Sequence, residues 1–258
     1  MQHANTQIFI MIMAITTVIL YKIFSARSGK YIYIRRIAGL KEIDEAVGRA
    51  TEMGRPMLFN TGNGDFTAAP TLAAMGVLGH VAQTAAKMGS RVIVFTCVPV
   101  VIPVAEDVVR GAYAAEGRPE LFNSADIRFL AAQGDQTALA SAQLMKEERT
   151  ASHFYFGTYD FTALLYTEPG QHMGAVQIAG CAEPNQIPFF IATCDYTVIG
   201  EELYAAGAYL TREPTMLGSL VGQDYCKIAV MSIIVIGTLL VTVMSTDGLR
   251  IINWIFGK

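Results

Sequence analysis

Two long apolar runs lie near the ends of the chain and frame a middle part of ordinary polarity. The first run, residues 8–20, reads IFIMIMAITTVIL, and residues 21–24 extend it past Lys22. A helix needs about 20 apolar residues to cross a bilayer, with roughly 17 as the lower limit. The run meets that limit if the Lys22 ammonium extends to the headgroups. We therefore predict an N-terminal transmembrane anchor over residues 1–25.

A cleaved signal peptide is the alternative explanation of this first run. Signal peptides carry positive charge before the apolar core and a small-x-small cleavage site after it. Here the basic residues follow the run, and no such site comes directly after it. The pattern favours an anchor that is retained.

The second run, residues 228–244, carries no charge and lies between Lys227 and Asp247. We predict a transmembrane helix over residues 226–245. No clear break separates this run from the segment that begins at Thr215, so we expect one continuous helix that leads into the membrane.

The last residues, 246–258, alternate apolar side chains with Arg250 and Asn253. Trp254 and Phe256 suit the boundary between headgroups and acyl chains. This pattern predicts a short amphipathic tail that lies on the membrane surface.

Between the two runs, helix-like and strand-like segments alternate along residues 37–225. Residues 91–97, RVIVFTC, are apolar without alternation, as in a parallel strand buried on both faces. Residues 41–53, KEIDEAVGRATEM, place apolar side chains along one helical face. Repeated strand–helix units predict an α/β domain with a doubly wound, mostly parallel, Rossmann-like sheet. The expected strands are residues 57–60, 91–97, 127–130, 153–156, 175–179 and 189–193. The expected helices are residues 41–53, 67–88, 104–116, 136–148, 161–168 and 201–210.

Basic residues gather on one side of the first anchor, and they predict its orientation. Residues 1–7 hold no Lys or Arg. Lys and Arg favour the cytoplasmic side of a span. We therefore predict a basic linker over residues 26–36, an α/β domain on the cytoplasmic side of the inner (cytoplasmic) membrane, and both termini outside. Two basic residues of the tail would then lie outside, against five in and beside the linker. Those five are Lys22, Arg27, Lys30, Arg35 and Arg36.

Composition excludes several classes of protein. Hydrophobic residues make up 52% and charged residues 16%, and the net charge is −3. The chain has no basic field for nucleic acid, so we expect no nucleic-acid partner. Its four cysteines are far apart and form no CxxC motif, which argues against zinc, haem c and redox-dithiol sites. Free, buried thiols in a reducing compartment are the simplest interpretation.

Ligands of parallel α/β sheets bind outside the carboxyl ends of the strands. The first candidate is the turn Gly62-Asn63-Gly64-Asp65, where backbone N–H groups could hold a phosphate. The turn fails as a dinucleotide fingerprint because Thr67 replaces the third glycine, and no Walker lysine follows. The alternative interpretation is a glycine turn that caps a helix and binds no ligand. Such turns are more common than phosphate sites.

Further candidates follow other strands. Thr96 and Cys97 end one expected strand, and we place Cys194 and Asp195 in a similar position. A cysteine here could be a nucleophile if a histidine met it, although buried cysteine is more often a small hydrophobe.

Gly157 begins a turn that ends at Asp160, which could simply cap a helix starting at Phe161. Glu201 and Glu202 suit the first turn of a helix better than a catalytic pair. The histidines show no metal spacing. We thus expect no catalytic set, no metal and no cofactor. The speculative ligand-binding set is Gly62, Asn63, Gly64, Asp65, Thr96, Gly157 and Asp195.

Several blocks of the middle domain resemble a prokaryotic family of membrane-anchored proteins known only as a domain of unknown function. The resemblance covers nearly all of the middle domain and the second apolar run. It implies a shared α/β fold with a membrane anchor, but no functional residue. This chain departs slightly from the family at Asn63 and Asp65, in the glycine turn. The blocks are IRRIAGLKEIDEAVGRATEMGRPMLFNTG (34–62), PVAEDVVRGAYAAEGRPE (103–120), VQIAG (176–180) and CDYTVIGEELYAAGAYL (194–210).

Two functions remain open at this stage. The first is a structural or scaffolding subunit, held in the lipid bilayer, that assembles as a homo-oligomer or with other membrane subunits. It follows from the missing catalytic set, the two anchors and the small residues on helix faces. The alternative is a sensor or enzyme that binds a nucleotide or phosphate ligand at the carboxyl ends of the strands. Transport is disfavoured because two spans offer few polar residues for a pathway.

Overall fold

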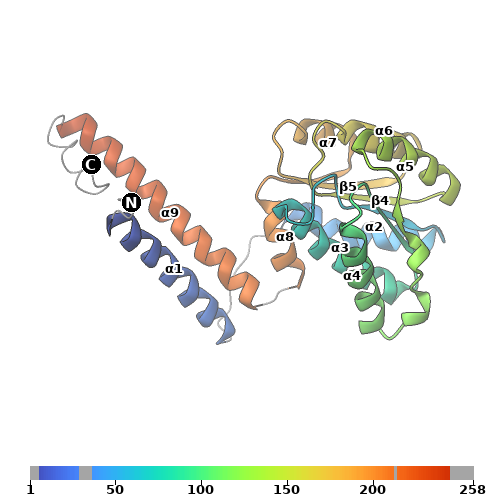
Figure 1. Ribbon diagram of the computed structural model, residues 1–258, viewed down its shortest axis with the longest axis horizontal. Helices are drawn as coiled ribbons and strands as arrows, with labels where there is room; N and C mark the ends of the chain where they lie inside the picture. Colours follow the sequence, from blue (N-terminus) through green and yellow to red (C-terminus); the bar gives the residue numbers. More distant parts are fainter. Residues whose placement is uncertain (1–5, 29–36, 212–213, 245–258) are drawn as a thin grey trace. The chain divides into compact units, whose positions relative to one another are not determined.

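The computed structural model describes residues 6–28, 37–211 and 214–244 (Figure 1). Contacts divide the chain into two compact units. One unit holds residues 35–211, and the other combines residues 1–34 with residues 212–258. Each unit is described by itself below.

The larger unit is built on a six-stranded sheet in which every pair of neighbouring strands is parallel. The strand order is β3-β2-β1-β4-β5-β6, with the reversal of direction along the sheet between β1 and β4. The strands are β1 (Met57–Asn60), β2 (Val92–Thr96), β3 (Ile127–Phe129), β4 (Ser152–Phe156), β5 (Val176–Cys181) and β6 (Tyr196–Ile199). This arrangement confirms the predicted doubly wound, parallel α/β fold.

Helices cover both faces of the sheet and enclose two apolar cores (Figure 1). Phe59 and Phe154 point to the core under α2, α3, α4 and α8. Phe95 and Tyr155 point to the core under α5, α6 and α7. Burial on both faces explains why these strands are apolar without alternation. The helices are α2 (Ala38–Glu52), α3 (Ala69–Met88), α4 (Val101–Ala115), α5 (Gly134–Glu148), α6 (Ala163–His172), α7 (Ile187–Thr193) and α8 (Glu202–Thr211), with 3-10 turns η1 (Pro119–Leu121) and η2 (Ser124–Asp126).

One predicted strand is wrong. Residues 189–193 belong to helix α7, and the sixth strand is β6, which sequence analysis missed. Gln186 and Phe190, one helical turn apart, are the buried residues here, and Pro188 lies in the first turn, where proline fits a helix. β6 has only four residues and a single fully buried one, Val198, so its apolar signal is weak.

The smaller unit consists of two helices that lie side by side, α1 (Thr6–Arg27) and α9 (Pro214–Met244) (Figure 1). Residues 9–27 and 217–239 are long and apolar enough to cross a membrane. α9 is continuous, as expected from Thr215 onward, and residues 214–225, which we assigned to the α/β domain, form its first part. The predicted tail, residues 246–258, and most of the basic linker lie outside the described residues.

Candidate functional site

The carboxyl ends of β1 and β4 meet at the point where a doubly wound sheet usually holds its ligand. Here the two loops that leave these strands are bonded to each other. Asn63 N donates to Thr158 O at 2.6 Å. A Cβ on Gly62 would lie 2.6 Å from Thr158 N, and one on Gly157 would lie 2.4 Å from Thr61 O. Only glycine permits so close an approach, so these two glycines close the crevice rather than line it.

The Asn63 side chain fills the remaining space between the loops. Its Nδ2 donates to Thr162 Oγ1 at 2.9 Å, and its Oδ1 accepts from Tyr166 Oη at 3.0 Å. Cys97 Sγ donates to the same Oδ1 at 3.5 Å. One amide thus joins the loops after β1, β2 and β4, and its hydrogen-bonding groups are turned toward the protein.

The other members of the glycine turn have local partners. Gly64 O accepts from Thr71 Oγ1 at 3.2 Å. Asp65 Oδ1 accepts from Phe66 N at 2.7 Å, and Asp65 itself is exposed. Thr96 is buried at the end of β2, where its Oγ1 accepts from Val98 N at 3.1 Å. The structure therefore brings Gly62, Asn63, Thr96 and Gly157 to one edge of the sheet.

Asp195 does not join them. It precedes β6, at the amino end of the sheet, because the segment before it is helix α7 and not a strand. Its carboxylate accepts from Gln177 N at 2.8 Å, and its own N–H donates to Gln177 O at 2.9 Å. Asp195 thereby connects the beginnings of β5 and β6, on the opposite edge from the glycine turn.

The cysteines are poor nucleophiles in this setting. Burial raises the pKa of Cys97, and it raises the pKa of Cys181 to about 11 and that of Cys194 to about 12. A raised pKa keeps a thiol protonated at neutral pH, and the thiolate is the reactive form.

Asp160 does not cap a helix at Phe161. It has a left-handed backbone with φ of 49°, and α6 begins at Ala163 after the N-cap position Thr162. The backbone N–H groups of Tyr159 and Asp160 both donate to Glu183 Oε2 at 3.1 Å. Burial raises the pKa of Glu183.

Glu183 was missed by sequence analysis. An acid two residues after the end of the strand VQIAGC was the available signal. Its carboxylate ties the loop after β5 to the loop after β4, so this edge is bonded along three neighbouring strands.

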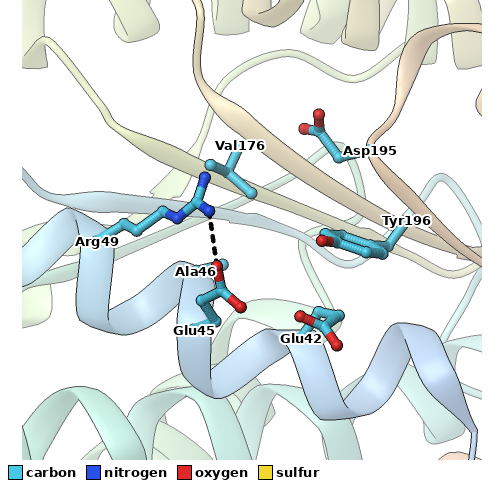
Figure 2. Close-up of a pocket in the computed structure, with 7 residues that line it drawn as sticks. All are labelled: Glu42, Glu45, Ala46, Arg49, Val176, Asp195 and Tyr196. Carbon is cyan, nitrogen blue, oxygen red and sulfur yellow. Dashed lines mark hydrogen bonds and ion pairs between the residues drawn. The ribbon is translucent and has the colours of Figure 1, made fainter.

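A hollow lies at the opposite, amino edge of the sheet (Figure 2). It has a volume of about 60 Å³, and side chains from α2 face residues that begin β5 and β6 across it. Glu45 and Arg49 pair with each other at 2.6 Å on the exposed surface of α2. A neighbouring hollow of about 320 Å³ shares Arg49, Val176 and Asp195 with it. The lining residues of the first hollow are Glu42, Glu45, Ala46, Arg49, Val176, Asp195 and Tyr196.

These charges do not form a metal or catalytic site. The only guanidinium lining the hollow is paired with Glu45, and Asp195 is bonded to the backbone of β5. Within the described ranges, no group of three or more His, Cys, Asp or Glu side chains is arranged to hold a metal ion. The hollow is a solvated surface between α2 and the sheet, and it supplies no reactive pair.

Comparison with known proteins identifies a family but no activity. No curated protein and no solved structure matches the chain. A family model described as a domain of unknown function, DUF6754, matches residues 1–252. This match confirms the resemblance to a family of unknown function and extends it to the first apolar run. The chain therefore belongs to the DUF6754 family.

Proposed function

We propose that this chain is a structural subunit, anchored in a membrane, that assembles with copies of itself or with other membrane subunits. One observation carries the proposal: the crevice between β1 and β4 is closed by the protein's own groups. Asn63 turns its amide inward, and the backbones at Gly62 and Gly157 touch. An enzyme of this fold needs that crevice for its substrate, whereas a scaffold needs only the fold's outer surface.

The two apolar helices support the membrane location. Residues 9–27 and 217–239 have the length and composition of membrane spans. The basic residues that follow the first helix favour a cytoplasmic α/β domain in the cytoplasmic membrane, with both termini outside.

The mass of the purified particle tests assembly. The full chain is extracted in mild detergent, and its protein mass is measured by light scattering or native mass spectrometry over a hundredfold range of concentration. We expect a mass of at least two chains at the higher concentrations. A single chain at every concentration, both in detergent and in lipid nanodiscs, would refute homo-oligomeric assembly. Co-purification from native membranes then tests a mixed complex.

Cysteine labelling tests the orientation. Gln2→Cys and Asp65→Cys are made separately in a chain whose four cysteines are replaced by alanine. A maleimide that does not cross membranes is added to intact cells and to permeabilised cells. We expect label at position 2 in intact cells, and label at position 65 only after permeabilisation. The reverse pattern would place the α/β domain outside.

A ligand-binding function is the second candidate, and one buried group favours it. Thr61 Oγ1, at the end of β1, has no hydrogen-bond partner in the described part of the chain, although Thr61 is completely buried. Such a group is costly unless something bonds to it. A panel of nucleotides and phosphorylated compounds is tested for a shift in the unfolding temperature. A shift that Asp65→Ala abolishes and Asp107→Ala keeps would support this function. No shift with any compound would exclude these ligand classes.

A further inference from the structure

α1 and α9 pack antiparallel in a defined register. Arg27 Nε donates to Thr215 Oγ1 at 3.2 Å. A Cβ on Gly218 would lie 2.6 Å from Ile23 Cα, so a step forward along α9 corresponds to a step back along α1. Gly222 repeats this close approach one helical turn later. The two glycines allow the helices to touch backbone to backbone.

The seam between the two helices has two flanks, and each flank holds one base of α1. On one flank, the Arg27 guanidinium bonds to Thr215 of α9. On the other flank, the Lys22 ammonium lies 3.9 Å from the centre of the Tyr225 ring. Helical periodicity places these two bases roughly 140° from each other around α1. Each base is therefore held by α9 at its own position, and a variant of one leaves the other in place.

Arg27 lies at the end of α1 that would reach the bilayer surface. It is the last residue of the candidate span 9–27, and in the proposed orientation this end of α1 meets the cytoplasmic headgroups. In the described part of the chain, the guanidinium bonds to Thr215 through Nε alone, so both Nη groups remain for another acceptor. A planar guanidinium can donate two parallel N–H bonds to the oxygens of one phosphate group.

Within the described ranges, Arg27 has no acidic partner. It bonds to a hydroxyl, and residues 1–41 and 214–223 contain no Asp or Glu. Glu213, directly before α9, lies outside the described residues, and a variant below tests it. The positive charge of Arg27 therefore suits an anion from outside the chain. Four arginines of the α/β unit instead pair with carboxylates of their own chain, namely Arg49, Arg91, Arg110 and Arg128.

Deeper along α1, the flank that holds Arg27 is apolar. Leu20 and Phe24 lie within roughly 60° of Arg27 around the helix. Their side chains are 48% and 63% exposed. On α9, Ser219 lies one turn after Thr215 and adds a second hydroxyl to this flank. The flank thus carries a base and hydroxyls near the bilayer surface and apolar side chains beyond them, which is the polarity of a phospholipid.

We propose that an anionic phospholipid binds this flank of the α1–α9 seam, with its phosphate on the Nη groups of Arg27. One acyl chain then lies along Leu20 and Phe24. A zwitterionic lipid also carries a cation, and the neighbouring segments offer no acid to receive it, so a lipid of net negative charge is preferred. The inference rests on the membrane location in the proposed function and names a ligand for the anchor.

Native mass spectrometry of the full chain in mild detergent tests the site. The protein is titrated with phosphatidylglycerol or with phosphatidylcholine, and bound lipids are counted. We expect the first phosphatidylglycerol to bind about tenfold more tightly than phosphatidylcholine, because a charge-assisted pair forms only where its phosphate charge is not offset. Equal affinity for the two lipids would contradict the proposal.

Two variants that remove the same charge separate a site from a general field. R27Q should lose the preference for phosphatidylglycerol, whereas K22Q, on the other flank, should keep it. R27K retains the charge without the planar fork and should have an intermediate preference. Circular dichroism checks that each variant keeps its helices. An equal loss in R27Q and K22Q would show a diffuse attraction and overturn the assigned site.

Glu213→Gln tests whether this neighbouring acid neutralises Arg27. We expect the preference for phosphatidylglycerol to be the same as in the wild type or stronger. A preference that is missing in the wild type and appears only in Glu213→Gln would mean that Glu213 holds the guanidinium, and it would overturn the proposal.

Unfolding in nanodiscs distinguishes a lipid phosphate from a soluble one. The chain is placed in phosphatidylcholine nanodiscs, and its unfolding temperature is measured with added phosphatidylglycerol, inorganic phosphate or glycerophosphoglycerol. We expect phosphatidylglycerol in the bilayer to raise the unfolding temperature of the wild type but not of R27Q, and the two soluble compounds to leave it unchanged. An equal rise with inorganic phosphate would assign the site to a soluble anion and overturn the lipid as its ligand.

Extraction of native membranes separates failure of this inference from failure of the proposed function. A chain that alkaline carbonate releases from membranes is not embedded in them, which contradicts the membrane location and the lipid site together. A chain that stays in the membrane but shows no preference for phosphatidylglycerol contradicts the lipid site alone. Retention in the membrane together with a preference that R27Q abolishes supports both.

Discussion

Charged side chains are used differently in the two units of the chain. In the α/β unit, Asp126 is almost fully buried, and Arg91 Nε donates to it at 2.8 Å. Arg91 and Arg128 both bind Glu148, at 2.8 and 2.6 Å. In the α1–α9 pair, the side chains of Asp224 and Lys227, three residues apart on α9, contact each other at 4.0 Å. The first unit joins charges from distant parts of the sequence, whereas the second pairs two charges within one helix.

The two units therefore depend on different kinds of contact. A domain whose charges and sheet-edge loops are bonded internally keeps one structure by itself. The helix pair depends instead on two glycines, Gly218 and Gly222, that let the backbones of α1 and α9 approach closely. Breaking the contacts of the α/β unit should therefore change its stability, whereas a bulky side chain at either glycine should separate the two helices. The predictions that follow test this division.

The largest effect is expected for Gly157→Ala. A methyl group there would lie 2.4 Å from Thr61 O, at a φ of 138° that favours glycine. We expect the free energy of unfolding to fall by about 4 kcal/mol, because backbone atoms of two strands must separate. The measurement is thermal unfolding of the full chain in detergent. Gly111→Ala, in α4 with open space around it, is the matched control and should change little. Equal tolerance of both changes would mean that the crevice is not closed.

Acid should weaken the α/β unit through His153. Burial lowers the pKa of this completely buried imidazole to about 4, from an ordinary 6.5. The folded state therefore holds a neutral ring. The contribution of this neutral ring to the free energy of unfolding is complete above pH 6.5. The free energy of unfolding then falls by about 3 kcal/mol in all as the pH falls from 6.5 toward 4.

The test compares the pH dependence of wild type and His153→Gln. The variant should be less stable at pH 7.5, because the ring nitrogen Nε2 lies 2.7 Å from Thr150 Oγ1 in the wild type. Its stability should nevertheless fall less steeply between pH 6.5 and 4. Parallel curves for the two proteins would show that His153 does not titrate as the structure implies.

Asn63→Ala distinguishes a structural residue from a ligand-binding one. Removing the amide leaves the Tyr166 hydroxyl and the Cys97 thiol without this acceptor, and we expect a loss of about 2 kcal/mol. Asn185→Ala, at an exposed position, should have almost no effect. Unchanged stability in Asn63→Ala, together with loss of a ligand-induced shift, would support the nucleotide-binding alternative instead.

The smallest effect on stability is expected in the helix pair. Gly222→Leu places a side chain against Ile19 Cα and should separate α1 from α9, at a cost of about 1 kcal/mol. Leu220→Ala, on the opposite face, is the control for helix–helix packing within one chain. Crosslinking between cysteines placed at positions 19 and 221 measures the change. If Gly222→Leu leaves that crosslink intact, the antiparallel register is wrong.

The fold was largely predictable because its strongest signals are local. Residues 92–96 and 152–156 are buried on both faces, and such strands are mostly apolar, although β4 also buries Ser152 and His153. The error at residues 189–193 arose because a run of four apolar residues followed by a threonine fits a short helix and a buried strand equally well. That error also moved Asp195 to the wrong edge of the sheet. A short edge strand such as β6, with one fully buried residue, has almost no apolar pattern by which it could be predicted.

The candidate site was less predictable, because contacts between residues distant in the sequence decide whether the crevice is open or closed. The sequence predicted that Gly62, Asn63 and Gly157 lie at the carboxyl edge of the sheet, but it could not show that they contact each other. The bond from Tyr166 to Asn63 joins residues about a hundred positions apart. The register of α9 against α1 could not be predicted for the same reason, because the sequence of neither helix shows how the two pack.

The contact between α1 and α9 can form only late in the synthesis of the protein. α1 ends at Arg27 and α9 begins at Pro214, so about 190 residues are synthesised between the two, which takes roughly 10 to 40 s at ordinary rates. In the proposed membrane-bound chain, α1 enters the bilayer with its contact surface for Gly218 and Gly222 uncovered. It keeps that surface exposed to lipid, or to helices of neighbouring nascent chains, while the whole α/β unit is translated. Among the described elements, the final helix, α9, is thus the one that covers the contact surface of α1.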